Sequence, residues 1–288
     1  MRHLLTACAL AAALAACAST SSAEDDNAAA TADSAAAAPA ADADALRQAV
    51  AGSWRDPANV ARDRYRHPAQ TLEFFGVRPG QTVVEITPGG GWYAEILAPL
   101  LREDGQYVAA VVDPMAVEGG GRDYQQKAKS RLEAKFAAAP AQFDRARLVG
   151  YDPNAPVFGA PGSADVVLTF RNVHNWRSAG QAEGMFRGFF AVLKPGGVLG
   201  VAEHRAKGDV GADDKSGYVG QQEVIAMAQA AGFRLDASSE VNANPKDTRD
   251  HPNGVWTLPP TNRHDDADDA KYQAIGESDR MTLRFVKP

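Results

Sequence analysis

Strand-like and helix-like segments alternate between residues 81 and 231, and this alternation constrains the fold more than any other feature of the sequence. The strand-like segments are short and largely apolar, and they lie at 81–86, 106–112, 146–151, 164–170 and 198–203. Helices are predicted at 92–101, 122–139, 179–193 and 218–231. Apolar strands joined through helices form a parallel sheet with helices on both faces. We therefore predict an α/β fold with a doubly wound, mostly parallel sheet.

The C-terminal part departs from this alternation. Strands are predicted at 233–241 and 281–286, without a convincing long helix between them. Strands that lack a helical crossover pair antiparallel, so we expect the sheet to end in an antiparallel C-terminal strand. The span between them, about 242–279, is rich in Pro, Asn, Asp and His and is interpreted as an insertion. Long structured loops are often functional.

An acid followed by a glycine-rich turn marks the end of the first predicted strand. The strand delivers Glu85, and Gly89, Gly90 and Gly91 then lead into a helix. Glycines let a ligand approach the backbone closely, and the start of a helix offers free N–H groups. An acid ahead of the glycines suits a ligand that carries an ammonium group. The alternative is a purely structural strand-to-helix turn.

Two further acids follow the next strands. Asp113 ends the second predicted strand, where a carboxylate can accept both hydroxyl groups of a ribose. Asp152 follows the third strand, and its neighbour Pro153 makes a turn-forming role an equal possibility. A solvated loop carboxylate is the alternative for Asp113.

Polar residues also follow the strand at 164–170, where open α/β sheets bind ligands. Arg171, Asn172 and His174 are the candidate catalytic residues there, with His174 as a general base. Alternatively, Arg171 and Asn172 hold the loop and His174 caps the next helix. Glu203 and His204 end the following strand. Together with His174 they match no ligand spacing, so we expect no metal site.

These motifs together resemble class I S-adenosylmethionine (SAM)-dependent methyltransferases. Their first motif has the form acid-x-Gly-x-Gly-x-Gly, which Glu85, Gly89 and Gly91 match, whereas Thr87 replaces the first glycine. The resemblance implies a Rossmann-like methyltransferase sheet, SAM as cofactor and methyl transfer as the reaction. It also implies that Glu85 and the turn that includes Thr87 and the three glycines hold the methionine end. Asp113 would hold the ribose and Asp152 the adenine side, with residues 171–174 facing the acceptor.

The sequence is also similar to a bacterial group of exported, lipoprotein-type predicted methyltransferases. The shared segments run from about residue 63 to the C-terminus and include 66–68, 88–93, 170–176, 194–197 and 278–280. This group supplies no acceptor. The segment 63–68 precedes the first strand and is a candidate lid over the cofactor.

The N-terminus has the pattern of an export signal. A basic start and an apolar run lead to Cys17 in the order Leu14-Ala15-Ala16-Cys17, which resembles a lipoprotein cleavage site. We expect a signal peptide at 1–17, lipidation of Cys17, a disordered Ala-rich tether at 18–44 and the methyltransferase-like domain at 45–288. The protein would then be periplasmic and held at a membrane only by its lipid. The alternative is ordinary signal cleavage, which leaves Cys17 without a role.

Charge and cysteine content narrow the functions. The formal net charge of −6 argues against nucleic-acid binding, which needs a basic surface. The cysteines, Cys8 and Cys17, both precede the predicted domain, so the domain has no disulfide and no cysteine-ligated metal. Two hypotheses remain. One is a SAM-dependent methyltransferase that acts on a small-molecule or envelope acceptor. The other is a non-catalytic ligand-binding or interaction lipoprotein on the same scaffold, since SAM is made in the cytoplasm.

Overall fold

The computed structural model describes residues 40–211 and 213–288. The predicted signal peptide, Cys17 and the predicted tether up to residue 39 lie outside the described residues. Residues 40–50 are helical, so this helix includes the last residues of the predicted tether. Residues Ala41–Pro288 form one compact unit. Within the described ranges, no helix combines the length and apolar character needed to cross a bilayer.

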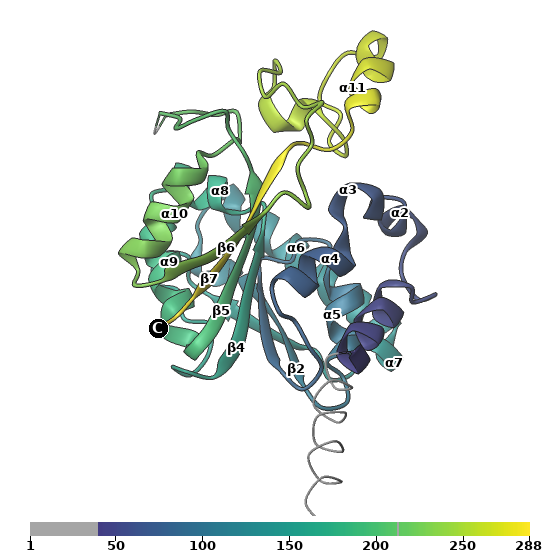
Figure 1. Cartoon of the computed structure of the whole chain (residues 1–288), viewed down its shortest axis with the longest axis vertical. Coiled ribbons are helices and arrows are strands. Elements are labelled where there is room, and N and C mark those ends of the chain that lie inside the picture. The colour runs from purple at the N-terminus through teal and green to yellow at the C-terminus, as the bar shows by residue number, and fades with distance from the viewer. Residues whose placement is uncertain (1–39, 212) are drawn as a thin grey trace, which may run out of the picture. The chain divides into compact units, whose positions relative to one another are not determined.

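The centre of this unit is a seven-stranded sheet in the order β3-β2-β1-β4-β5-β7-β6 (Figure 1). Its strands are β1 (Thr82–Ile86), β2 (Gln106–Val112), β3 (Arg147–Tyr151), β4 (Ala164–Phe170), β5 (Leu193–His204), β6 (Arg234–Ser239) and β7 (Arg280–Val286). The pairs among β1 to β5 are parallel. Strand β7 lies between β5 and β6 and is antiparallel to both. The predicted α/β class, the mostly parallel sheet and the antiparallel C-terminal strand are therefore confirmed.

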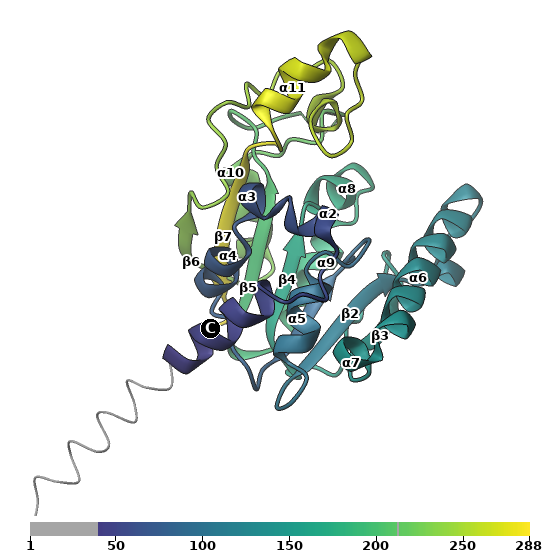
Figure 2. The ribbon, with the colours of Figure 1, turned by 90° about the vertical axis from the view of Figure 1, so that its right-hand side faces the viewer.

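Helices cover both faces of the sheet, as Figures 1 and 2 show. The helix at 40–50 packs on one face with α4 (Pro68–Phe74), α5 (Ala94–Leu100), α6 (Gly120–Ala138) and α7 (Pro140–Phe143). The opposite face carries α8 (Val173–Ser178), α9 (Ala182–Val192) and α10 (Gln221–Ala230). Each layer buries its own apolar cluster, so the central strands β1 and β4 are buried on both sides. That arrangement explains their apolar sequences.

Two local differences from the prediction have physical reasons. The helix predicted at 179–193 is preceded by the short helix α8, because Asn172 and Val173 already turn the chain after β4. Strand β5 begins at Leu193, so the segment 194–197 belongs to this strand and the predicted strand at 198–203 is longer than expected. The pairing of β4 with β5 shifts register between Ala164 and Val166, which accommodates this Gly-containing segment.

The connection from β6 to β7 is the predicted insertion. It contains the 3₁₀ helices η2 (Gly254–Thr257) and η3 (Asp266–Asp268) and helix α11 (Asp269–Ile275), and it lies beyond the carboxyl ends of the parallel strands (Figure 2). Helices α2 (Pro57–Val60) and α3 (Asp63–Arg66) lie at the same end of the sheet (Figure 1).

Two buried acids hold the insertion in place. Asp247 accepts hydrogen bonds from the Tyr218 hydroxyl at 2.9 Å, from His251 Nε2 at 2.8 Å and from the Asp279 N–H at 2.7 Å. Asp279 in turn pairs with Arg205 and Arg249, each at 2.8 Å. Buried carboxylates with several donors fix a loop firmly, since an unpaired buried charge is costly.

Candidate functional site

A cavity of about 770 Å³ opens at the carboxyl ends of β1, β4 and β5. Small-molecule sites commonly measure about 300–1,000 Å³, so its size suits a nucleoside-sized ligand with a second small molecule. One wall, which follows β1, includes Thr87, Gly89 and Gly90, and a second wall, which follows β4, includes Arg171 and His174. The insertion contributes further lining residues, namely Val255, Trp256, Pro259, Pro260, Thr261, Glu277 and Ser278. Strand order reverses between β1 and β4, which is where open α/β sheets bind their ligands.

The three glycines after β1 have two different roles. Gly89 has a φ of 58° and, like Gly90, has no atom within 4 Å of the place a Cβ would occupy. Both line the cavity, so a ligand can approach their backbone closely. Gly91 does not line it. A Cβ on Gly91 would lie 2.9 Å from Leu132 Cδ1 of α6, so this glycine allows helix packing.

Thr87 stands in the left-handed region, with a φ of 51°. A β-branched residue is strained there, and glycine is the residue that adopts this conformation freely. The Thr87 hydroxyl and the Tyr151 hydroxyl are 2.7 Å apart and share a hydrogen bond. That bond ties the end of β1 to the end of β3 and compensates for part of the strain.

Glu85 is the one acid inside β1, and it lines the cavity. Burial raises the pKa of Glu85 to about 7, although a hydrogen bond from the Tyr107 hydroxyl (2.6 Å) and the nearby Arg66 favour the charged form. A carboxyl group with such a pKa ionises readily when a cation approaches. Glu85 is thus suited to pair with an ammonium group of a ligand.

Asp113 and Asp152 are engaged in local backbone bonds. Asp113 Oδ1 accepts the N–H of Met115 at 2.9 Å and caps the 3₁₀ helix η1 (Pro114–Ala116). Asp152 Oδ1 accepts the N–H of Asn154 at 2.8 Å. Neither residue is among those lining the cavity, although Val112 and Pro153 beside them are. The structure therefore places both acids at the margin of the cavity.

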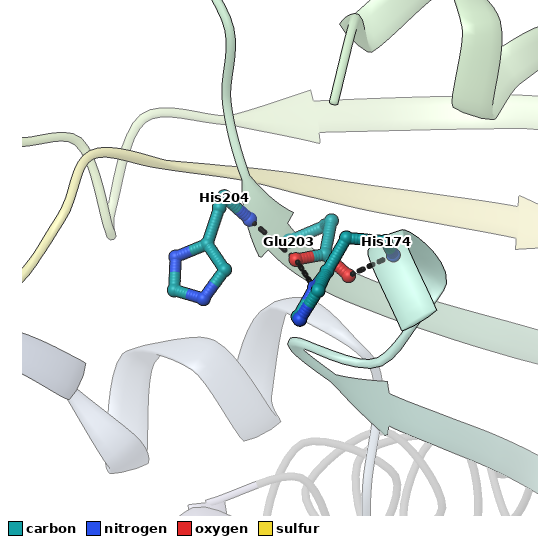
Figure 3. Close-up of side chains that lie close together, drawn as sticks. All are labelled: His174, Glu203 and His204. Carbon is teal, nitrogen blue, oxygen red and sulfur yellow. Dashed lines mark hydrogen bonds and ion pairs between the residues drawn. The ribbon is translucent and has the colours of Figure 1, made fainter. Parts of the chain in front are cut away.

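A buried carboxylate orients His174. Glu203, at the end of β5, is fully buried, and its Oε1 lies 3.1 Å from His174 Nδ1 (Figure 3). The Glu203 carboxylate also accepts the N–H of Val173 at 2.6 Å and that of His204 at 2.8 Å. With Nδ1–H donating to Glu203, Nε2 of His174 carries the free lone pair. A carboxylate–imidazole pair of this kind supports general-base chemistry.

His204 completes a group in which His174, Glu203 and His204 have potential ligand atoms within 4.8 Å of one another (Figure 3). His174 thus meets the adjacent residues Glu203 and His204 although it lies 29 residues before Glu203, and the sequence spacing did not predict this. The hydrogen bonds favour orientation over metal coordination, because both Glu203 oxygens already accept N–H groups. Burial, and then the charges of His174 and Arg171, lower the pKa of His204 well below its usual value. His204 is accordingly neutral, with Nδ1 at 2.5 Å from Ser278 Oγ.

Four arginines surround Glu277 beside these histidines. Arg62 Nε lies 2.7 Å from Glu277, Arg66 Nε 3.2 Å and Arg280 Nη1 3.0 Å. Burial alone would raise the pKa of Glu277, but the neighbouring guanidinium groups outweigh it and lower the pKa to about 2. Arg171 is the fourth, and its guanidinium forms no ion pair within 4.0 Å of any described acid. Burial lowers the pKa of Arg171 to about 10.

Asn172 anchors the turn that carries Arg171. Asn172 Nδ2 donates to the Ile86 carbonyl at 3.0 Å, which ties the end of β4 to the end of β1. Arg171 itself has a φ of 62°, a strained backbone conformation. The structure thus brings the three candidate catalytic residues to one wall of the cavity and gives Asn172 a positioning contact.

The sequence did not assign Arg62, Arg280, Glu277 or Trp256 to the site. They reach it through helix α3, strand β7 and the insertion, and no local motif marks them. A partial signal existed, since the segments 66–68 and 278–280 belong to the resemblance described above.

No sequence-family model matches the chain, and no curated protein matches it in sequence. Solved structures do match its fold. A SAM-dependent methyltransferase from Aquifex aeolicus aligns with a TM-score of 0.53 over 81% of this chain and 94% of that one, at 16% identity. A putative sarcosine dimethylglycine methyltransferase from Galdieria sulphuraria gives 0.51 over 81% and 88%, at 15% identity. This chain has the class I SAM-dependent methyltransferase fold.

The same fold also serves another reaction. The [4+2]-cyclase SpnF aligns with a TM-score of 0.55 over 84% of this chain and 91% of that one, at 16% identity. Similarity at this level of identity establishes the architecture only. The reaction therefore depends on the cavity and its residues.

Proposed function

We propose that the protein is a SAM-dependent methyltransferase. The observation that carries the proposal is the open space beside Gly89 and Gly90. It lies between β1 and β4, where the strand order of the sheet reverses. No side chain of the described residues fills the place a Cβ would take there.

The residues of this wall suit the cofactor. Glu85 would pair with the ammonium group of the methionine end, and the backbone beside Thr87, Gly89 and Gly90 would accommodate that end closely. Asp113 and Asp152 would face the ribose and adenine from the margin of the cavity once their local turns adjust. SAM, when bound, supplies a methyl group on a sulfonium.

The opposite wall would serve the acceptor. His174, held by Glu203 through Nδ1, has Nε2 free to take a proton from an acceptor hydroxyl, amine or thiol as the methyl group is transferred. Asn172 holds the turn that carries this imidazole. Orientation of the two reactants does most of the work in such a displacement, so a modest base suffices.

Binding tests the proposal directly. Calorimetry with the purified protein should show binding of S-adenosylhomocysteine. An absence of binding at millimolar ligand would refute the proposal.

The second candidate function is non-catalytic ligand binding. Thr87 supports it, because this residue stands at a φ of 51° where the methyltransferase motif has glycine, and the fold does not fix the function. Transfer of labelled methyl groups from SAM to cell-envelope extract discriminates the two. Transfer by the parent protein, and none by a Gly89→Glu, Asp113→Ala variant, would exclude the non-catalytic function. Binding of S-adenosylhomocysteine without any transfer would favour it.

We further propose that the chain is exported and anchored through a lipid on Cys17. Support comes from the apolar run that ends directly before this cysteine. In cell fractionation, Cys17→Ala should move the protein from the membrane to the soluble fraction, whereas Cys8→Ala should leave it on the membrane. A Cys17→Ala protein that stays on the membrane would refute the anchor.

A further inference from the structure

The wall opposite the glycine turn carries an excess of positive charge. Arg62, Arg66, Arg171 and Arg280 lie around the carboxylate of Glu277, and Glu203 also acts on Arg171, so the four guanidinium groups outnumber the two carboxylates. The whole chain carries a formal net charge of −6, so this concentration of arginine is local. A buried cationic cluster in an acidic protein focuses the field on anionic ligands.

Several donors of this cluster have no partner within the described part of the chain. Arg62 Nη2, Arg66 Nη2 and Arg280 Nε are buried without a hydrogen bond. Arg171 lines the cavity, and its guanidinium makes no ion pair or hydrogen bond with any described residue. A buried donor left without a partner costs about 1–3 kcal/mol, more when charged. An anion in the cavity would satisfy several of them at once, since carboxylates and phosphates accept paired guanidinium bonds.

The cluster adjoins the cofactor turn at Arg66, whose guanidinium lies 4.8 Å from the ring centroid of Trp92, the residue after Gly91. Arg171, in contrast, follows β4, on the other side of the point where the strand order reverses. Arg171 is three residues before His174, which lies at the start of α8, and both residues line the cavity. A group bound at Arg171 is therefore placed beside the imidazole proposed to act on the acceptor.

We propose that Arg171, Arg66 and Arg62 form an anion subsite for the methyl acceptor, which is a small molecule bearing a carboxylate or phosphate. This inference rests on the proposed methyltransferase function. The strained backbone of Arg171 and the bond from Asn172 to β1 hold the subsite in position. The cofactor also has a carboxylate, so the experiment must separate the two sources.

Inorganic phosphate is the probe. Its dissociation constant is measured by calorimetry on the whole protein, first free and then saturated with S-adenosylhomocysteine. An acceptor subsite predicts that phosphate binds equally well in both cases. Competition between the two ligands would assign the cluster to the carboxylate of the cofactor and overturn the proposal.

The variants identify the residue. Arg171→Gln should weaken phosphate binding about tenfold and leave S-adenosylhomocysteine affinity unchanged, because one charge-assisted contact is lost. Arg171→Lys should retain part of the phosphate affinity. The matched control is Arg284→Gln. Arg284 lies on β7, as Arg280 does, but it pairs with Asp236 and does not line the cavity.

Each outcome decides a separate question. Absent phosphate binding, or equal binding by Arg171→Gln and the parent, would overturn the subsite. Melting temperatures of the variants show whether they are folded. If Arg171→Gln is not folded, Arg171→Lys replaces it in the comparison with the parent protein. Phosphate binding that depends on Arg171, without any binding of S-adenosylhomocysteine, would keep the anion subsite but refute the methyltransferase function and with it the acceptor assignment.

Discussion

The two walls of the cavity are built in different ways. The wall at the end of β1 consists largely of backbone, with Gly89 and Gly90 open to the cavity and Glu85 as its buried acid. The facing wall consists of side chains from α3, β4, β5 and the insertion, and from the segment that follows β4. One wall is thus made from a single contiguous segment and the other from parts that are distant in sequence. Substitutions at Gly89 and at Arg171 should therefore affect the binding of the cofactor and of the acceptor separately.

The largest effect is expected from a substitution that disrupts only the wall at the end of β1. Gly89→Glu places a side chain in the open space and forces a non-glycine residue to a φ of 58°. We expect the dissociation constant of S-adenosylhomocysteine to rise by about a hundredfold or more, while phosphate affinity stays unchanged. Calorimetry measures both.

Gly162→Glu is the matched control for this substitution. Gly162 also has a positive φ, 66°, and open space around it, but it does not line the cavity. Equal loss of S-adenosylhomocysteine binding in both variants would mean that backbone strain, rather than occupation of the site, causes the effect.

The second wall is tested through Glu203. Glu203→Gln removes the charge that supports a protonated His174, and it sets an amide against backbone N–H groups. Methyl transfer should slow by roughly thirtyfold with S-adenosylhomocysteine affinity unchanged, since base catalysis contributes on the order of 10²–10⁴-fold. Rates are measured with labelled SAM.

If Glu203 acts by positioning His174, the effect of its substitution should depend on His174. In His174→Gln the additional Glu203→Gln change should cost little, because the two residues act as a unit. Additive losses would contradict this. Glu223→Gln, which removes a carboxylate paired with Arg177 outside the cavity, should leave the rate intact.

The pH dependence of cofactor binding probes the first wall more gently. Burial raises the pKa of Glu85 to about 7, so the carboxylate that pairs with an ammonium group forms only as the pH passes that value. Affinity for S-adenosylhomocysteine should rise roughly tenfold from about pH 6 to pH 8, as ionisation goes from minor to dominant. Glu85→Gln should remove this dependence; a dependence that persists would assign it to another group.

The same carboxyl group affects stability in the opposite direction. Its pKa is higher in the folded protein than the usual 4.5, so the folded state binds the proton more tightly than the unfolded chain. The contribution of Glu85 to the free energy of unfolding is therefore lost as the pH rises from about 4.5 to about 7.

The smallest expected effect concerns Thr87. Thr87→Gly relieves a strain of about 1–3 kcal/mol but loses the bond to Tyr151 and adds freedom to the unfolded chain, costs of similar size. The free energy of unfolding should change by less than about 1 kcal/mol in denaturant titration. Tyr151→Phe, which removes only the bond, should destabilise the protein; a stability equal to that of the parent would show that the bond contributes nothing.

The contrast between the walls also explains how much the sequence could predict. The order of strands and helices followed from apolar periodicity, and the glycine turn from one contiguous motif. The roles within that turn did not follow, because the packing of Gly91 against Leu132 depends on a helix about forty residues away.

The second wall was predicted only in part. Arg171, Asn172 and His174 were found because they follow a strand, but Glu203 became a partner of His174 only through the adjacency of β4 and β5. Arg62 and Arg280 meet at Glu277 from opposite ends of the domain sequence. Such convergence depends on tertiary contacts that no local pattern encodes.

The reversed direction of β7 has a consequence for how such a protein changes its substrate range. Because β7 is antiparallel to β5, it begins at the end of the sheet where β5 ends, with Arg280 opposite His204. The long connection before β7 therefore covers the site, whereas the C-terminal end of β7 lies at the opposite end of the strands. Grafting a loop of different length between Ser239 and Glu277 would reshape that covering segment and leave the turn after β1 intact. New acceptors are then accessible through one exchangeable segment.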